Sequence, residues 1–340
     1  MMPNNFDFIR LVAAFLVLYG HSFVFLGLPE PLFLSWVPLG PLGVYIFFTI
    51  SGYLITESWE RDPNLIRFFQ RRALRIFPGL IVCVLLLIFF LGLLLTTLSW
   101  QDYFKNQYTW QYLSNIVLYI TYYLPGTFAT NRVPNAVNGS LWSLPAEFFM
   151  YILVAVFGCI KVNRWFYPFF AFLLMLASYF WATKSKEMLV IYNTDLRQVV
   201  MCGVYFWVGS AFYKFKIKQY FSVSSIVMAF ILLCCFEKSS FMFVAAWILL
   251  PIIVLGFGFS YSDLLHRLVS TGDYSYGVYI YAFPIQQSVV YLYPNMSIGL
   301  YLLVCSILTM VCAFFSWHLI EKKALLLKPR AIKSSELNSK

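Results

Sequence analysis

Two ionisable side chains interrupt the first apolar stretch of the sequence. Arg10 and His21 lie eleven residues apart, and an α-helix of 3.6 residues per turn returns them to nearly the same face, about 16 Å apart along its axis. Asp7 lies three residues before Arg10, a spacing that allows the two to pair. Ionisable side chains within a spanning helix are costly and usually face the protein interior or a water-filled cavity. The spacing therefore predicts an interior polar stripe with a guanidinium at one end and an imidazole at the other.

A purely structural interpretation of this pair is also open. The Arg10 guanidinium can extend to the membrane interface, and His21 can hydrogen-bond a neighbouring helix. Helix geometry alone favours neither interpretation, so the choice depends on which other polar residues lie within the membrane-spanning helices.

A carboxylate, Glu147, occupies a third costly position. It ends the segment Ser-Leu-Trp-Ser-Leu-Pro-Ala-Glu that begins at Ser140, and we expect it one to two turns inside the outer end of a spanning helix. His21 is expected at a similar depth from the same surface, so the carboxylate could orient the histidine as a base. The alternative is a structural carboxylate that binds a helix end. The cost of an unpaired carboxylate in a membrane favours the catalytic interpretation.

A cluster of arginines precedes the third long apolar stretch. We expect Pro78 in the first turn of the helix that follows, and Arg72 and Arg75 on one face of their own segment. Guanidinium groups suit bidentate recognition of phosphate. The cluster, which also includes Arg71, can instead fix the membrane topology or bind anionic lipid.

The elements that carry these residues follow from composition. The 340 residues are 61% hydrophobic and 11% charged, whereas a soluble domain has about 25% charged residues. Apolar stretches near the ~20 residues needed to cross a bilayer recur along the whole chain. We therefore predict an all-α, polytopic transmembrane bundle with about ten spanning helices, near residues 8–27, 40–57, 78–98, 142–160, 166–183, 197–213, 222–236, 241–259, 274–293 and 299–319.

The distribution of positive charge predicts the orientation of this bundle. With ten spans, 18 of the 24 lysines and arginines lie on the side of the two termini, which the positive-inside rule assigns to the cytoplasm. The same rule makes residues 112–124 a surface segment of an external loop at 99–141 rather than a span. The net charge of +10 is thereby explained by topology, without a nucleic-acid partner.

The chain is expected to form one membrane domain over residues 1–325, followed by a disordered cytoplasmic tail over residues 326–340. The seven cysteines all lie in apolar stretches without metal-ligand spacing, so we read them as small buried hydrophobes and expect no metal site. No internal repeat is evident, which disfavours an inverted-repeat transporter.

Five short motifs follow one another over nearly the whole chain. They are Phe6-Asp7-Phe8-Ile9-Arg10 with Gly20-His21; residues 43–54; Arg72 and Arg75 before Ile76-Phe77-Pro78; Ser140-Leu141-Trp142-Ser143 with Glu147; and Gly272, Ser275, Tyr276, Tyr279 and Pro284. In type and order, these motifs resemble the acyltransferase-3 family of integral membrane acyltransferases. One departure is Ala282, where many members carry a histidine, so we assign no catalytic role there.

The resemblance implies transfer of an acyl group, most often acetyl from acetyl-CoA, to a hydroxyl of an extracytoplasmic glycan or lipid-linked sugar. It implies an enzyme of a bacterial cytoplasmic (inner) membrane, whose acyl-CoA is a substrate rather than a tightly bound cofactor. Some relatives carry a fused extracytoplasmic esterase-like domain, and we expect none in this chain.

Within this scheme each polar residue has an expected role. His21 is expected as general base or transient acyl carrier, supported by Glu147 and Arg10. We expect the arginine cluster at the donor phosphates and the Ser-Leu-Trp-Ser segment near the substrate, with two serines as candidate oxyanion donors. The donor-binding residues are Arg72, Arg75 and Arg71, and the substrate contacts are Ser51, Ser143 and Trp142.

Two other functions compete with this one. A proton-coupled transporter or flippase of a sugar-like or lipid-linked substrate would also use Arg10, His21 and Glu147 on an internal path. A non-catalytic scaffold or sensor would leave the five ordered motifs unexplained, and it ranks last.

Overall fold

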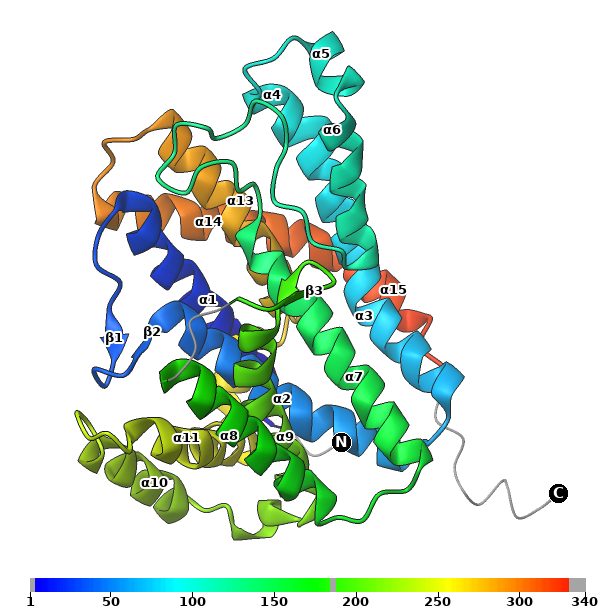
Figure 1. The fold of residues 1–340 in the computed structure, drawn as a ribbon, viewed down its shortest axis with the longest axis vertical. Helices are drawn as coiled ribbons and strands as arrows, with labels where there is room; N and C mark the ends of the chain where they lie inside the picture. Colours follow the sequence, from blue (N-terminus) through cyan, green and yellow to red (C-terminus); the bar gives the residue numbers. More distant parts are fainter. Residues whose placement is uncertain (1–3, 184–187, 330–340) are drawn as a thin grey trace, which may run out of the picture.

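The computed structural model describes residues 4–183 and 188–329, and nearly all regular structure there is helical (Figure 1). Two short antiparallel hairpins are the exceptions: β1 (Leu32–Phe33) pairs with β2 (Val37–Pro38), and β3 (Val190–Ile191) pairs with β4 (Thr194–Asp195). The chain is an all-α polytopic membrane protein, as predicted. Of the predicted tail at 326–340, residues 330–340 lie outside the described residues.

Each of the ten predicted spans coincides with a helix within the described ranges, although the helix at Val223–Cys235 has only 13 residues. Six helical stretches, some of which include an adjoining short element, are long and apolar enough to cross a membrane by length and composition alone. They are Phe6–Leu26, Leu39–Arg61, Leu65–Leu95, Gly139–Cys159, Met242–Phe259 and Ile298–Leu326. The ten helices are α1 (Phe6–Leu26), α2 (Leu39–Arg61), α3 (Leu65–Leu86), α7 (Ser143–Cys159), α8 (Phe166–Thr183), α9 (Leu196–Lys214), α10 (Val223–Cys235), α11 (Met242–Phe259), α13 (Ser275–Leu292) and α14 (Ile298–Ser316).

Shorter elements complete the described chain. A π-helical segment η1 (Leu87–Gly92) and α4 (Leu93–Leu95) extend α3, and η5 (Trp317–Glu321) and α15 (Lys322–Leu326) extend α14. The remaining pieces connect long helices: α5 (Trp100–Lys105), α6 (Gln107–Gln111), η2 (Tyr112–Val117), η3 (Gly139–Trp142), η4 (Ile217–Tyr220) and α12 (Asp263–Val269).

The helix that carries the arginine cluster begins earlier than predicted. The Asn64 side chain caps α3 by accepting a hydrogen bond from the Arg67 N–H at 3.0 Å, a standard way of satisfying a free amide at a helix start. Pro78 consequently lies inside α3 and not in its first turn, so that prediction was wrong. The arginines are therefore on a regular helix, whose period fixes the direction of each side chain.

The centre of the bundle depends on close helix contacts made by glycine. α2 packs against α1 on one side and α9 on the other. A Cβ at Gly52 would lie 1.8 Å from the Phe206 carbonyl oxygen of α9, and one at Gly43 would lie 2.4 Å from the Ala13 carbonyl oxygen of α1. Small residues permit such backbone approach between membrane helices. α2 is thereby held between two neighbours, with its polar residues in the interior.

Residues 112–124 do not form a spanning helix, in agreement with the prediction. The segment begins as the 3-10 turn η2, which follows α6 directly in the upper right of Figure 1, and then continues without helical structure. It packs against α3, and Tyr112 and Asn115 are fully buried. The Asn115 amide donates to the carbonyl oxygens of Tyr112 and Thr121, at 2.8 and 3.0 Å, which closes the loop on itself.

Candidate active site

A cavity of about 360 Å³, here called the basic cavity, is lined by residues from both ends of the chain. Asp7 near the start of α1 and Lys328 beyond α15 both line it, so the two ends of the described chain lie on one side of the bundle. An even number of spans requires that arrangement. The ionisable residues of its lining are Asp7, Arg10, Arg72, Arg75, Glu147, Tyr151, Asp273, Tyr276, Tyr279 and Lys328.

Two of its arginines are paired with carboxylates. Arg10 bonds Asp7 at 3.0 Å, as the three-residue spacing predicted, and Arg75 bonds Asp273 at 2.5 Å. Burial opposes ionisation of the Asp273 carboxyl, but the Arg75 and Arg10 guanidiniums outweigh it and hold its pKa below the ordinary value. Asp273 is thus a carboxylate that keeps Arg75 in position.

Arg72 differs from these two arginines. It forms no ion pair within the described residues, and its polar contact is a long 3.4 Å hydrogen bond to the Ser58 hydroxyl. Its buried Nε has no partner. A half-buried guanidinium in this state retains most of its capacity to bind an anion.

Lys328 is a lining residue that the sequence did not reveal. It lies in the segment predicted as a disordered tail, yet it is half-buried in the basic cavity. Burial, together with the positive charges of Arg75, Arg72 and Arg10, lowers the pKa of its ammonium to about 8. A lysine two residues beyond the C-terminal end of α15 carries no periodic signal that could have identified it.

Arg71, predicted to bind the donor, does not line the basic cavity. Its Nη1 donates to Asp62 at 2.7 Å, and Arg67 donates to the same carboxylate through Nε at 2.9 Å. Arg67 and then Arg71 hold the pKa of Asp62 at about 2, against the opposing effect of burial. Consecutive helix residues point about 100° apart, so Arg72 faces the cavity whereas Arg71 joins a structural cluster.

Glu147 lines the basic cavity and does not contact His21, contrary to the predicted pairing. One of its carboxylate oxygens accepts hydrogen bonds from the hydroxyls of Ser51 at 2.7 Å and Tyr151 at 2.6 Å. Ser51 and Ser143, predicted as substrate contacts, line this same cavity. The rotation of α7 about its axis directs Glu147 toward α2 and away from the α1 histidine.

His21 lines a second cavity of about 320 Å³, here called the histidine cavity, with Ser140 and Trp142. The imidazole packs edge-on against Phe283, with the ring centres 5.3 Å apart. Among the residues that the structure describes, its buried Nδ1 has no hydrogen-bond partner. An imidazole in this state has capacity for a polar ligand, because a buried ring nitrogen is normally satisfied.

The two cavities adjoin along α1. Arg10 lines the first and His21 the second, so the predicted polar stripe is present on one face of the helix. Two residues, Val44 of α2 and Tyr279 of α13, line both cavities. The arrangement forms an interrupted path through the bundle from a cationic chamber to an imidazole.

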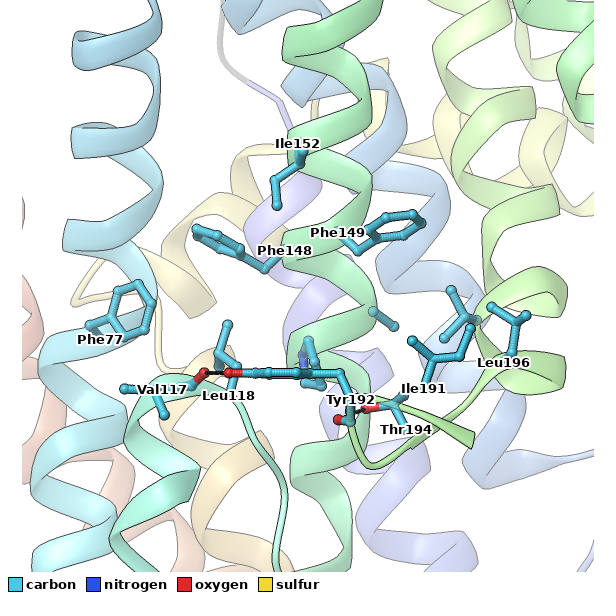
Figure 2. Close-up of a pocket in the computed structure, with 13 residues that line it drawn as sticks. Phe77, Val117, Leu118, Phe148, Phe149, Ile152, Ile191, Tyr192, Thr194 and Leu196 are labelled. Carbon is cyan, nitrogen blue, oxygen red and sulfur yellow. Dashed lines mark hydrogen bonds between the residues drawn. The ribbon is translucent and has the colours of Figure 1, made fainter. Parts of the chain in front are cut away.

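A third cavity, of about 490 Å³, lies between α3 and α7 and is largely apolar (Figure 2). Apolar side chains such as Phe77, Phe148 and Ile152 dominate its wall. The Tyr192 hydroxyl donates to the Val117 carbonyl oxygen at 3.0 Å and closes one side. Among the described residues that line it, Tyr192 and Thr194 carry hydroxyls, and none is a carboxylate, histidine, cysteine, lysine or arginine. The charged and imidazole side chains lie in the other two cavities. Within the described residues, no group of three or more His, Cys, Asp or Glu side chains could hold a metal ion.

A bundle of long apolar helices with two polar-lined cavities in its interior defines an integral membrane protein. A family model described as an acyltransferase domain matches residues 4–318. The chain belongs to the acyltransferase-3 family and is a membrane O-acetyltransferase. Family membership favours this activity over the transporter and scaffold alternatives.

Similar proteins extend over different shares of the chain. An O-acetyl transferase of Shigella phage Sf6 is 32% identical over 95% of this chain and 96% of its own length. Nodulation protein 10 of Rhizobium leguminosarum bv. viciae is 35% identical over 44% of this chain and 42% of its own length. The peptidoglycan O-acetyltransferase OatA of Listeria monocytogenes is 29% identical over 36% of this chain and 20% of its own length. No solved structure matches the chain.

Proposed function

We propose that the enzyme moves an acetyl group from acetyl-CoA, bound in the basic cavity, to a hydroxyl of an extracytoplasmic glycan or lipid-linked sugar in the histidine cavity. The observation that carries the proposal is the succession of the two cavities along α1, with cations in the first and an imidazole in the second. The O-acetyltransferase names of two relatives support an oxygen acceptor.

The proposed orientation puts the basic cavity on the cytoplasmic side of a bacterial inner membrane. The excess of lysine and arginine on the side of the two termini supports it. Acetyl-CoA is then available directly from the cytoplasm, and the acceptor approaches from outside. The acetyl group alone crosses the bilayer, while CoA remains on the side from which it came.

The donor phosphates are proposed to bind Arg72, Lys328 and Arg10. Charge-assisted hydrogen bonds to phosphate are among the strongest in proteins. Within residues 4–183 and 188–329, Arg72 has no competing carboxylate partner. Arg75 is held by Asp273 and shapes the cavity wall. The thioester end of the donor then extends past Glu147 and Ser51 toward Tyr279.

His21 is proposed to act at the acceptor hydroxyl. As general base, the imidazole takes the hydroxyl proton while the oxygen adds to the thioester carbonyl carbon; the carbon–sulfur bond then breaks and CoA thiolate leaves. As transient carrier, His21 would receive the acetyl group first. Initial-rate kinetics separate the two: crossing lines indicate direct transfer, and parallel ping-pong lines indicate an acetyl-enzyme.

The test is replacement of His21 by alanine. We expect acetyl transfer from labelled acetyl-CoA to fall by roughly 10²–10⁴-fold, the usual contribution of a general base, with unchanged membrane expression. The matched control is His266→Ala, because His266 is exposed on α12 and lines neither cavity. Near-normal transfer by the His21 variant would refute the assignment. Mass spectrometry of surface glycans, with and without the gene, identifies the acceptor by its acetyl increment.

A further inference from the structure

The wall between the two cavities is the position at which the two substrates must meet. If the donor lies in the basic cavity and the acceptor in the histidine cavity, the reacting carbonyl and hydroxyl come together where the cavities adjoin. Val44 and Tyr279 are the residues common to both linings. Val44 has no polar atom in its side chain, so Tyr279 supplies the polar side chain common to both linings.

The hydrogen bonds of Tyr279 determine what its hydroxyl can do. The phenol donates its one proton to the Ser140 carbonyl oxygen at 3.0 Å. The Ser143 hydroxyl lies 2.6 Å from the phenol oxygen, and because a phenol has a single O–H, Ser143 must be the donor in that contact. Tyr279 is therefore a donor that is itself polarised by a second hydroxyl behind it.

The ring of Tyr279 is held while its hydroxyl faces the junction. The side chain is 7% exposed, and its ring packs edge-on against Phe47 of α2 with centres 5.6 Å apart. The Ser140 carbonyl that accepts its proton lies in η3, the turn that leads into α7. A carbonyl oxygen that arrives from the basic cavity can replace this acceptor with a small rotation of the phenol.

We propose that Tyr279 is a catalytic residue of the acetyl transfer, whose phenol donates a hydrogen bond to the acetyl carbonyl oxygen at the junction of the two cavities. The acceptor oxygen adds to the carbonyl carbon, and negative charge develops on the carbonyl oxygen as the hydroxyl proton passes to His21. Tyr279 stabilises that charge until the carbon–sulfur bond breaks and CoA thiolate leaves. The phenol keeps its proton throughout, and Ser143 supports it from behind.

This inference rests on the proposed function, and the experiment separates the two. Tyr279→Phe keeps the ring between the cavities and removes the hydroxyl. We expect kcat for acetyl transfer to fall by roughly 10²–10³-fold, the usual effect of losing one oxyanion donor, with the KM for acetyl-CoA and the affinity for desulfo-CoA unchanged. Desulfo-CoA lacks the thioester, so its binding reports the donor site without the carbonyl contact.

The matched control is Tyr281→Phe, because Tyr281 is an equally buried tyrosine of the same helix that lines neither cavity. It should retain normal kcat, and equal melting temperatures for the two variants show that both are folded. A Tyr279→Phe enzyme with normal kcat, or one that loses activity together with desulfo-CoA binding, overturns the catalytic role. Absence of acetyl-CoA-dependent transfer in the unaltered protein instead refutes the proposed function itself.

Discussion

Replacement of Asp62 by alanine should destabilise the protein without touching the reaction site. The Asp62 carboxylate is 4% exposed and joins Arg67 to Arg71 at the turn between α2 and α3. Arg71 is itself buried, with 9% of its side chain exposed, and its Nε and Nη2 have no hydrogen-bond partner in the part of the chain that the structure describes. Loss of Asp62 removes the carboxylate that neutralises this buried guanidinium.

The size of the expected loss of stability follows from the burial of the Arg71 guanidinium. Removal of one partner of a buried ion pair costs about 3–5 kcal/mol, because the remaining charge has no compensation. The nearby pair of Glu60 with Lys214, at 2.8 Å, is exposed on the carboxylate side. Exposed pairs contribute only about 0–1 kcal/mol. Glu60→Ala is therefore a matched control at the same end of α2.

Thermal unfolding in detergent, monitored by fluorescence-detected size-exclusion chromatography, measures the difference in stability between the two variants. Asp62→Ala should lower the apparent melting temperature by about 5 °C, whereas Glu60→Ala should leave it nearly unchanged. The double variant Asp62→Ala/Arg71→Met should recover much of the loss, because removing both members of a buried pair costs far less than removing one. Equal losses in the single and double variants would refute the explanation by an unpaired guanidinium.

Two further predictions concern the donor site and the packing. The Lys328 ammonium, with its pKa lowered to about 8, is charged below that pH and neutral above it, so the KM for acetyl-CoA should rise about tenfold as the pH increases through 8. Lys328→Arg, which stays charged, should flatten this pH profile of KM. An unchanged profile in that variant would contradict a contact between Lys328 and the donor phosphates. Gly52→Ala should lower the free energy of unfolding in detergent by about 1–3 kcal/mol, because the new Cβ would meet the Phe206 carbonyl oxygen at 1.8 Å. Gly299→Ala is the control and should be neutral, because no described atom lies within 4 Å of its new Cβ. Equal effects of the two substitutions would contradict the packing argument.

The structural features that depend on one helix alone could be predicted from the sequence. The position of Arg10 and His21 on one face follows from the α-helical period, and the Asp7–Arg10 pair follows from their three-residue spacing. Both are present in the structure. The ten helices were equally accessible, because a chain with so few charges must alternate apolar spans with short polar connections.

The rotation and packing of one helix relative to another were harder to predict from the sequence. Glu147 and His21 can lie at similar depth and still face different chambers, because depth gives no information on the rotation of α7 relative to α1. The different directions of Arg71 and Arg72 depend on where α3 begins, and the Asn64 cap was not recognised as its start. Lys328 depends on how the end of the chain returns to the bundle, which no periodic pattern encodes. The roles of these residues in the reaction stay predictions.

The wall formed by Val44 and Tyr279 also bears on the energetics of the cell membrane. A continuous aqueous channel through the bundle would let protons and ions run down their electrochemical gradients. Because an isopropyl group and a buried phenol ring separate the two chambers, the protein can hold polar groups along its interior and remain an electrical insulator. Proteoliposomes that contain it should therefore sustain a potassium diffusion potential as long as protein-free vesicles do.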